Sequence, residues 1–127
     1  MEKLIYNREY ATYLNYTDLN RLEEWTEYIR EYLASVGYNT IVQTRRWSHF
    51  DIPWQSEIDR IRNNINKLYK AFHYLSEFKE ITFTNSLTFE QVNVMEWNLE
   101  TIYKWLKRMI DAFWYSNEAN LNEGGIA

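Results

Sequence analysis

The sequence predicts an all-α protein, a three-helix bundle built from a divergent internal helical repeat. Two runs of apolar residues support this prediction, because each repeats at alternating steps of three and four residues. The first run comprises Ile58, Ile61, Ile65, Leu68, Phe72 and Leu75, and the second comprises Val92, Met95, Leu99, Ile102, Leu106, Met109 and Phe113. An average step of 3.5 residues favours amphipathic helices that cross at a shallow angle, as in a bundle.

A third apolar stripe precedes these two, which indicates that the pattern recurs along the chain. It consists of Leu19, Leu22, Thr26, Ile29 and Leu33. Aligning residues 14–33 with residues 87–106 also matches two pairs of flanking polar residues, Asn20 with Asn93 and Glu23 with Glu96. Residues 57–61 resemble residues 18–22 in the same way. The residues expected to define the repeat are therefore Asn20, Glu23, Arg60, Asn93 and Glu96.

Capping signals place the three helices at about residues 17–36, 55–79 and 88–116. Thr17 and Ser56 are candidate N-caps for the first two helices, and Thr88 with Gln91 forms a capping-box pattern for the third. Gly37 is expected to end the first helix in the left-handed conformation. One domain of residues 1–115 follows from these bounds, with residues 116–127 as a polar, glycine-containing tail.

The connector of residues 38–54 is long for a helix bundle and rich in aromatic and β-branched residues. Its indoles, Trp47 and Trp54, either plug the bundle where the connector folds back over it or stand exposed for a partner. Residues 40–44 and 81–84 could each form a short extended segment. The sequence therefore also allows a minor two-stranded β pairing between them.

Composition argues against several classes of function. The 127 residues include no Cys, which removes disulfide frameworks, thiolate zinc sites and cysteine nucleophiles. The net charge is −4 and no basic block occurs, so we expect no nucleic-acid partner. No apolar run reaches the length of a signal peptide core or a membrane span. We therefore expect no membrane partner and synthesis in a cytoplasm.

Motifs for metal, cofactor or phosphate binding are not evident in the sequence. His49 and His73 lack the spacing of a zinc motif. Three glycines, two of them in the tail, cannot build a phosphate-binding loop. No Ser–His arrangement or nucleophile elbow is recognisable. We predict no cofactor, no metal and no catalysis.

Paired carboxylates are the one feature that suggests an acidic catalytic site. Two pairs, each one helical turn apart, are formed by Glu23 with Glu27 and by Glu96 with Glu100. An enzyme would need all four to converge in a pocket. The alternatives are a solvated face or hydrogen bonds to neighbouring connectors, and Asn20 and Asn93 are suited to hold connector backbone in the same way.

The aromatic residues must either fill the core or coat a contact surface. They make up 18% of the chain, with six Trp and eleven Tyr. The candidate interaction surface comprises Trp47, Trp54, Trp97 and Tyr103. Exposed indoles beside Asn, Gln and Asp side chains are also typical of sugar binding. A glycan- or cell-surface-binding module is therefore the alternative function.

Three stretches of the chain share spaced residues with a known module. They are residues 16–23 with Tyr28 and Leu33, then Trp47 with residues 51–53, 57–65 and Leu68, and finally residues 87–89 with Asn93, residues 95–99, Ile102 and Tyr103. This pattern resembles a helical module of phage and prophage tail, baseplate and fibre-type virion proteins from Gram-positive gut bacteria (Firmicutes). The resemblance covers about residues 6–115.

The resemblance implies a structural or adaptor protein of the virion, made in the bacterial host cytoplasm. Its expected partners are other virion proteins and copies of itself. Virion components are commonly symmetric assemblies, so a ring or a trimer is expected. The resemblance carries over no catalytic or ligand-binding residues.

Overall fold

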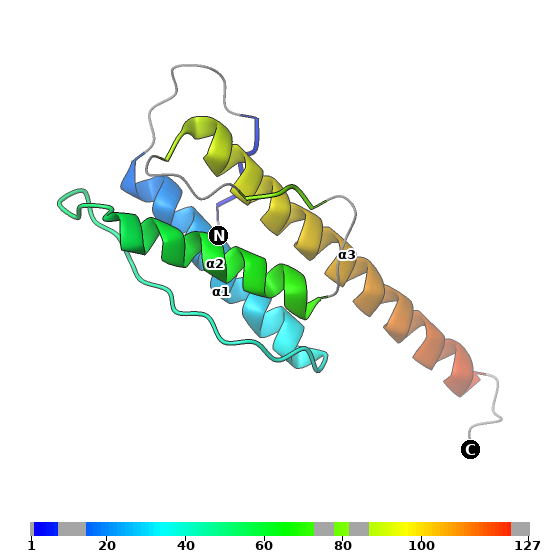
Figure 1. The fold of residues 1–127 in the computed structure, drawn as a ribbon. Helices are drawn as coiled ribbons and strands as arrows, with labels where there is room; N and C mark the ends of the chain where they lie inside the picture. The colour runs from blue at the N-terminus through cyan, green and yellow to red at the C-terminus, as the bar shows by residue number, and fades with distance from the viewer. Residues whose placement is uncertain (1, 8–14, 73–77, 82–86, 123–127) are drawn as a thin grey trace.

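In the part of the chain that the structure describes, three α-helices run side by side in the same direction (Figure 1). The computed structural model describes residues 2–7, 15–72, 78–81 and 87–122, with side chains of the last helix as far as Ala112. Helix α1 spans Tyr16–Ser35, α2 spans Gln55–Ala71 and α3 spans Phe89–Asn122. The predicted all-α class and three-helix bundle are confirmed.

The parallel direction of the helices explains the long connectors. A helix of 20 residues such as α1 is about 30 Å long. The chain must travel back over that length before α2 can start beside the beginning of α1. Residues 38–47 do this as extended chain along the bundle (Figure 1). Within the described residues no β-strand forms, and residues 82–84 of the predicted β pairing lie outside them.

The start of α1 differs from the prediction. Asn15 is the N-cap, and its side chain accepts a hydrogen bond from the Thr17 backbone N–H at 2.9 Å. The Asp18 carboxylate accepts in return from the Asn15 N–H at 3.0 Å, which completes a capping box. Thr17 was the wrong N-cap because it already lies inside the first helical turn.

The predicted start of α2 was also wrong in its N-cap, whereas that of α3 was correct. The N-cap of α2 is Trp54, which makes no side-chain capping bond, and Ser56 was the wrong cap because it lies within the helix. The capping box predicted for α3 is confirmed. The Gln91 N–H donates to the Thr88 hydroxyl at 3.2 Å, and the Thr88 N–H donates to the Gln91 side chain at 3.4 Å.

The predicted end of α1 at Gly37 is confirmed, whereas α2 and α3 end at other residues than predicted. Gly37 has φ of 93°, and the Tyr38 N–H closes the end of α1 on the Leu33 carbonyl at 3.0 Å. Helix α2 ends at Ala71 rather than near residue 79, since residues 78–81 are not helical. Helix α3 continues to Asn122, beyond the predicted end at residue 116.

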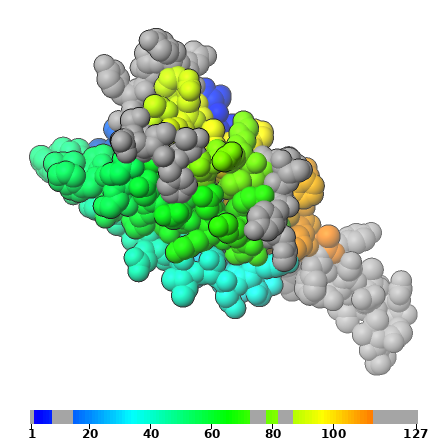
Figure 2. All heavy atoms as spheres, viewed as in Figure 1, coloured from blue at the N-terminus to red at the C-terminus, as the bar shows by residue number. Residues whose placement is uncertain are grey.

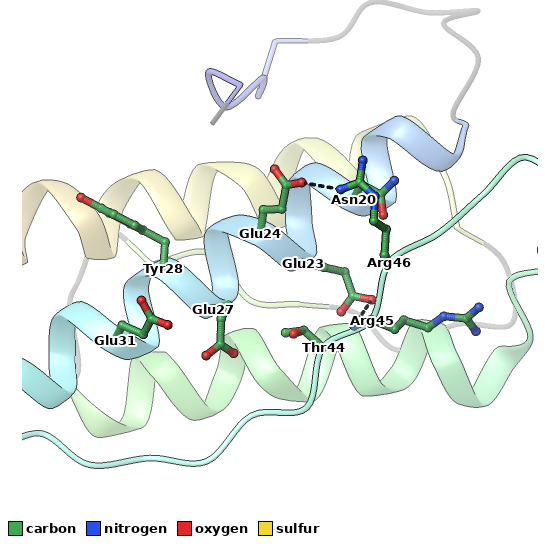
Figure 3. Close-up of a pocket in the computed structure, with 9 residues that line it drawn as sticks. All are labelled: Asn20, Glu23, Glu24, Glu27, Tyr28, Glu31, Thr44, Arg45 and Arg46. Carbon is green, nitrogen blue, oxygen red and sulfur yellow. Dashed lines mark hydrogen bonds and ion pairs between the residues drawn. The ribbon is translucent and has the colours of Figure 1, made fainter.

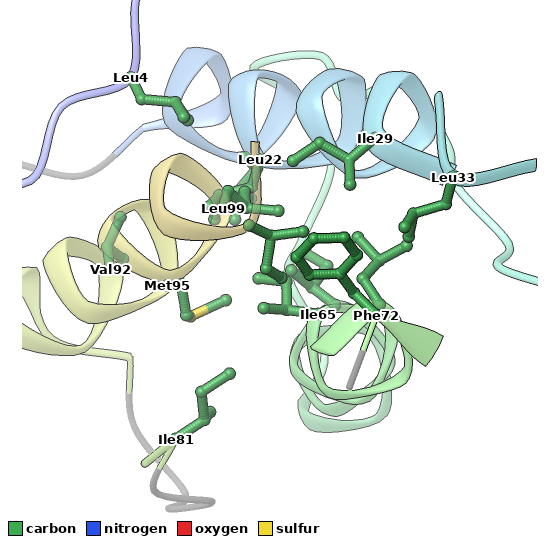
Figure 4. Packing of buried hydrophobic residues seen from close by; sticks show 14 of the residues in the cluster. Leu4, Leu22, Ile29, Leu33, Ile65, Phe72, Ile81, Val92, Met95 and Leu99 are labelled. Atoms are coloured by element: carbon green, nitrogen blue, oxygen red, sulfur yellow. The ribbon is translucent and has the colours of Figure 1, made fainter. Parts of the chain in front are cut away.

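The apolar stripes of the three helices meet in one core (Figure 4). Leu22 and Ile29 of α1, Ile65 of α2, and Leu99 of α3 are fully buried. Non-helical residues complete the core, including Leu4 and Trp47. Truncating one of these fully buried Leu or Ile residues to Ala should cost about 2–5 kcal/mol, which makes the shared stripe the main source of stability.

Candidate interaction surface

Two glutamates that flank the predicted repeats are buried in ion pairs. The Glu23 carboxylate is contacted by both terminal nitrogens of Arg60 on α2, each at 2.7 Å. Glu96 accepts from Nε of Arg21 on α1 at 2.6 Å. The exposed fractions of Glu23 and Glu96 are 2% and 0%. Buried charges of this kind need such partners, because an unpaired one carries a large desolvation cost.

The two arginines respond electrostatically to these partners. Burial acts to lower the pKa of Arg21, but hydrogen bonds and charges of Glu96 and Asp18 outweigh it and raise the pKa above its usual range. The hydrogen bond to Glu23 is the main cause of the raised pKa of Arg60. Both guanidiniums are therefore firmly charged and serve as fixed cross-links between helices.

The same two glutamates also hold extended chain on the bundle. Glu23 accepts from the Arg45 N–H at 3.2 Å and from the Trp47 indole N–H at 2.8 Å. Glu96 accepts from the Ile5 N–H at 3.0 Å. Of the alternatives for these residues, hydrogen bonding to connectors is the one observed.

The second members of the two carboxylate pairs lie apart from these cross-links. Glu27 and Glu100 are half-buried, and Glu27 pairs with Arg30 at 2.6 Å. A cleft of about 560 Å³ between α1 and residues 44–46 contains Glu23 and Glu27 but neither Glu96 nor Glu100 (Figure 3). Within the described residues, no three His, Asp or Glu side chains are grouped to hold a metal ion. His73 lies outside those residues.

Asparagines fix connector backbone by paired hydrogen bonds. The Asn20 side chain donates to the Trp47 carbonyl at 2.9 Å and accepts from the Trp47 N–H at 2.6 Å. Asn98 binds both backbone groups of Lys79 in the same way, each at 2.8 Å. The sequence singled out Asn20 but missed Asn98, whose signal was a polar residue directly beside the buried stripe. Asn93 lies half-buried on α3.

The predicted interaction residues have different environments. Trp47 is 2% exposed and plugs the bundle, so its indole is closed to partners. Trp97 is half-buried, with the Tyr6 ring 5.3 Å away and the Lys79 ammonium 4.5 Å from its ring centre. Tyr103 is half-buried against Trp25 at 5.3 Å between ring centres.

Trp54 alone among the predicted four is largely exposed, and it belongs to an apolar tip that precedes α2. We use the term tip for Phe50, Ile52 and Trp54, whose exposed fractions are 83%, 60% and 65%. Sequence reasoning missed Phe50 and Ile52, because an apolar residue in a connector carries no local sign of its exposure. The loop that contains the tip protrudes at the end of the bundle where α2 begins, as the ribbon and the space-filling view show (Figures 1 and 2).

A hydrogen-bonded turn supports this tip. The Asp51 carboxylate accepts from the Ser48 N–H at 2.7 Å, and the Asp51 N–H donates to the Ser48 carbonyl at 3.0 Å. Arg45 adds an ion pair to Asp51 at 3.3 Å. The backbone bond from Ser48 is the main cause of the lowered pKa of Asp51. These bonds order the backbone of residues 48–51, next to the exposed side chains of the tip.

No helix in the described part of the chain combines the length and apolar character needed to cross a membrane. Comparisons with protein-family models, with curated protein sequences and with solved structures found no match.

Proposed function

We propose that the protein is a structural or adaptor component of a phage virion, in the tail, baseplate or an appendage, and that it acts by protein–protein assembly. The observation that carries this proposal is the supported apolar tip of Phe50, Ile52 and Trp54. Single exposed apolar residues are ordinary, but contiguous ones mark contact sites. Aromatic side chains are enriched among binding hot spots, and an ordered backbone beneath them lowers the conformational entropy lost on contact.

The interior polar groups support an assembly role in a second way. The buried carboxylates of Glu23 and Glu96 pair with Arg60 and Arg21. The side-chain amides of Asn20 and Asn98 bind the backbone of the connecting segments. These groups hold the fold together and so are not poised for chemistry on a substrate. With the phage-module resemblance, this favours a component that contacts other virion proteins and copies of itself, with no role for nucleic acid or membrane.

The proposal includes the internal repeat, with one unit consisting of an extended segment followed by its helix. Each helix donates from one side chain to a carbonyl of the extended segment that precedes it: Trp25 to Glu2, Asn64 to Gln43, and Asn98 to Lys79, all at 2.8 Å. The alignment of residues 18–22 with 57–61 places Trp25 and Asn64 at corresponding positions. A recurring bond at a recurring position supports descent from one unit.

Ion pairs recur between the units as well. Arg21 bridges Asp18 of its own helix and Glu96 of α3. The corresponding Arg60 bridges Glu57 of its own helix and Glu23 of α1. The contact between α2 and α3 differs from these two. At the position that corresponds to Glu23, α2 carries the buried Arg62, which donates to the Gln91 side chain of α3 at 3.0 Å.

The virion role is tested on purified particles. Particles are prepared from the phage or the induced lysogen that carries the gene, and their proteins are quantified by mass spectrometry. We expect the chain in a fixed ratio to a tail protein after density-gradient purification, and antibody labelling at one place on the particle. Its absence from intact particles, with abundant protein in the lysate supernatant, contradicts the proposal.

Glycan binding is the second candidate, and the exposed Trp54 is the observation that favours it. An indole face in water can stack on a sugar ring, whereas the buried Trp47 cannot. Titration with cell-wall polysaccharide fragments should then change tryptophan fluorescence in the wild type but much less in Trp54→Ala. A flat titration in the wild type removes this candidate.

A further inference from the structure

We infer that the groove between α1 and α3 binds an extended peptide segment of a neighbouring protein, on a floor made by the rings of Tyr28, Tyr32 and Tyr103. The inference rests on the proposed repeat and assembly role, because the occupied groove of one unit identifies the occupant of another. The partner it names is a chain that lies extended and directs every second side chain toward the bundle.

The groove between α1 and α2 shows how such a segment is held. Residues 41–47 lie in it as extended chain and are bonded to both helices (Figures 1 and 3). The Arg45 N–H donates to Glu23 of α1 at 3.2 Å. From the other side, Asn64 of α2 donates to the Gln43 carbonyl at 2.8 Å. Side chains of the two helices thus fix the backbone of the segment between them.

Side chains at the start of this segment alternate between the bundle and the solvent. Residues 38, 40 and 42 are half-buried, whereas residues 39, 41 and 43 are exposed. Tyr38 and Val42 pack against the core. Such alternation is the property of an extended chain, since successive side chains point to opposite sides. The groove therefore accepts a chain with large or β-branched residues at alternate positions.

The groove between α1 and α3 holds the segment before α1 by equivalent bonds. Trp25 of α1 donates to the Glu2 carbonyl at 2.8 Å, and the Ile5 N–H donates to Glu96 of α3 at 3.0 Å. Leu4 is buried and joins the core (Figure 4). Both bonds have their counterparts in the other groove, at helix positions that the repeat relates to each other.

Tyr28 lies where the other groove holds two more residues of extended chain. In that groove, Lys67 of α2 donates to the Ile41 carbonyl at 3.5 Å. The alignment of the units places Tyr28 of α1 at the position of Lys67. The described part of the segment before α1 starts only at Glu2, and the Tyr28 ring is 37% exposed. A peptide that continues this segment would therefore pass over Tyr28, with a carbonyl near its hydroxyl.

Aromatic rings form the floor of this stretch. Tyr28 points from α1 toward α3 (Figure 3), where its ring centre lies 6.0 Å from that of Tyr103 and 5.9 Å from that of Tyr32. The counterparts of Tyr28 and Tyr32 on α2 are Lys67 and Ala71, so the floor is more aromatic here than in the occupied groove. Aromatic-lined grooves are a recurring means by which proteins hold extended peptides.

An NMR titration of the whole protein with a synthetic peptide tests the groove. The peptide is the segment of residues 38–43, blocked at both ends, because this sequence fills the corresponding groove. We expect saturable shifts of the Tyr28 and Tyr103 ring resonances, with a Kd on the order of 1 mM. A control peptide carries Tyr38→Ser and Val42→Ser, which remove the side chains that face the bundle, and should cause no saturable shift.

A covalent graft makes the test independent of weak peptide affinity. Residues 38–42 are joined in front of Glu2, which keeps the register in which Gln43 corresponds to Glu2. Tethering gives the segment an effective concentration in the millimolar range. The graft should raise the denaturant midpoint and move the Tyr28 resonance in the same direction as the free peptide. A graft with Ser at the two inward positions should do neither.

Three variants locate the binding site, and circular dichroism establishes that each keeps the helical fold. Tyr28→Ser removes the ring and should weaken peptide binding at least tenfold, about the effect of losing a hot-spot contact. Tyr28→Phe keeps the ring and should retain most of the affinity. Tyr16→Ser is the matched control, since Tyr16 is 39% exposed at the start of α1, and should bind as the wild type does.

Three outcomes overturn the inference. If neither the peptide nor the graft moves the Tyr28 resonance of the folded protein, the rings themselves close the groove. If Tyr28→Ser binds the peptide as tightly as the wild type does, the peptide lies elsewhere. If the Tyr28 and Tyr103 resonances shift with protein concentration alone, a second copy of the chain is the occupant instead of a different protein.

The outcome is distinct from that of the virion experiment. Particles that contain the chain while its groove binds no peptide leave the virion role standing and remove the groove as a docking site. Peptide binding by a chain that is absent from particles does the reverse.

Discussion

Arg21 and Glu96 form a buried ion pair that joins α1 to α3, with Arg21 Nε 2.6 Å from Glu96 Oε1. The same carboxylate oxygen accepts from the Ile5 N–H at 3.0 Å. One side chain therefore fixes a neighbouring helix and the segment before α1 at once. The cost of burying both charges is offset only while both partners are present.

Replacing Glu96 by Gln should lower the free energy of unfolding by about 3 kcal/mol, because Arg21 would remain charged and buried beside a neutral side chain. The loss stays near the lower end of the usual range since Asp18 still contacts Arg21. Urea denaturation followed by circular dichroism measures it. Glu100→Gln, on the same helix at a half-buried site, is the control and should cost less than about 0.5 kcal/mol. Equal losses from the two variants contradict the assigned role of Glu96.

Asn98→Ala should loosen the segment before α3. The buried Asn98 amide is bonded to both backbone groups of Lys79, and its loss should cost about 1–2 kcal/mol. Hydrogen exchange should become faster at the Lys79 amide, while amides in the middle of α1 keep their protection. Asn98→Asp keeps the acceptor but buries a carboxylate beside the Lys79 carbonyl, so it should destabilise the protein at least as much as Asn98→Ala. Asn63→Ala, exposed on α2, is the control and should leave the Lys79 amide unchanged.

The two helix starts that differed from the sequence prediction give a direct contrast. Asn15→Ala removes the capping box of α1 and should cost about 1 kcal/mol in the free energy of unfolding. Ser56→Ala lies inside the first turn of α2, which has no side-chain cap, and should change stability by less than about 0.5 kcal/mol. Denaturant midpoints of the two variants decide between the caps. A larger loss for Ser56→Ala would contradict this assignment.

Periodicity predicted the helices and their buried faces, because burial of an amphipathic stripe depends on spacing along one helix. The direction of the helices does not follow from spacing, since a stripe reads the same for parallel and antiparallel neighbours. The length of connector 38–54 was the available clue, because a parallel neighbour requires a return path. The start of α1 was missed for a local reason. Asn15 and Thr17 are both good caps, and the reciprocal bond from Asp18 selects Asn15.

The candidate site was predicted less completely. Trp54 was identified from its residue type, but Phe50 and Ile52 acquire their significance from the turn at Asp51, which a list of aromatics does not reveal. Trp47 has the same residue type as Trp54 and the opposite environment. The Trp47 backbone N–H donates to Asn20 and its indole N–H donates to Glu23. These long-range bonds cannot be predicted from the connector sequence alone.

Acidification should release the turn that supports the tip. The Ser48 backbone bond, then the Ser48 hydroxyl and the charge of Arg45, lower the pKa of Asp51 below the 3.8 of an unperturbed aspartate. A carboxyl whose pKa is lower in the folded state contributes stability above its unfolded pKa, and that contribution is lost as pH falls through the folded pKa. The Ser48 amide resonance should therefore shift with a midpoint below pH 3.8.

Asp51→Asn should abolish this titration, with the Ser48 amide already displaced at neutral pH, because a neutral amide is a weaker acceptor than the carboxylate. Asp111→Asn, on α3 and away from the tip, is the matched control and should leave the Ser48 profile as in the wild type. Because the chain has six Trp, the difference in fluorescence between the wild type and Trp54→Phe, recorded along the same titration, reports whether the tip loosens with its turn. A Ser48 shift centred above pH 3.8, or one that persists in Asp51→Asn, would show that another group controls the turn.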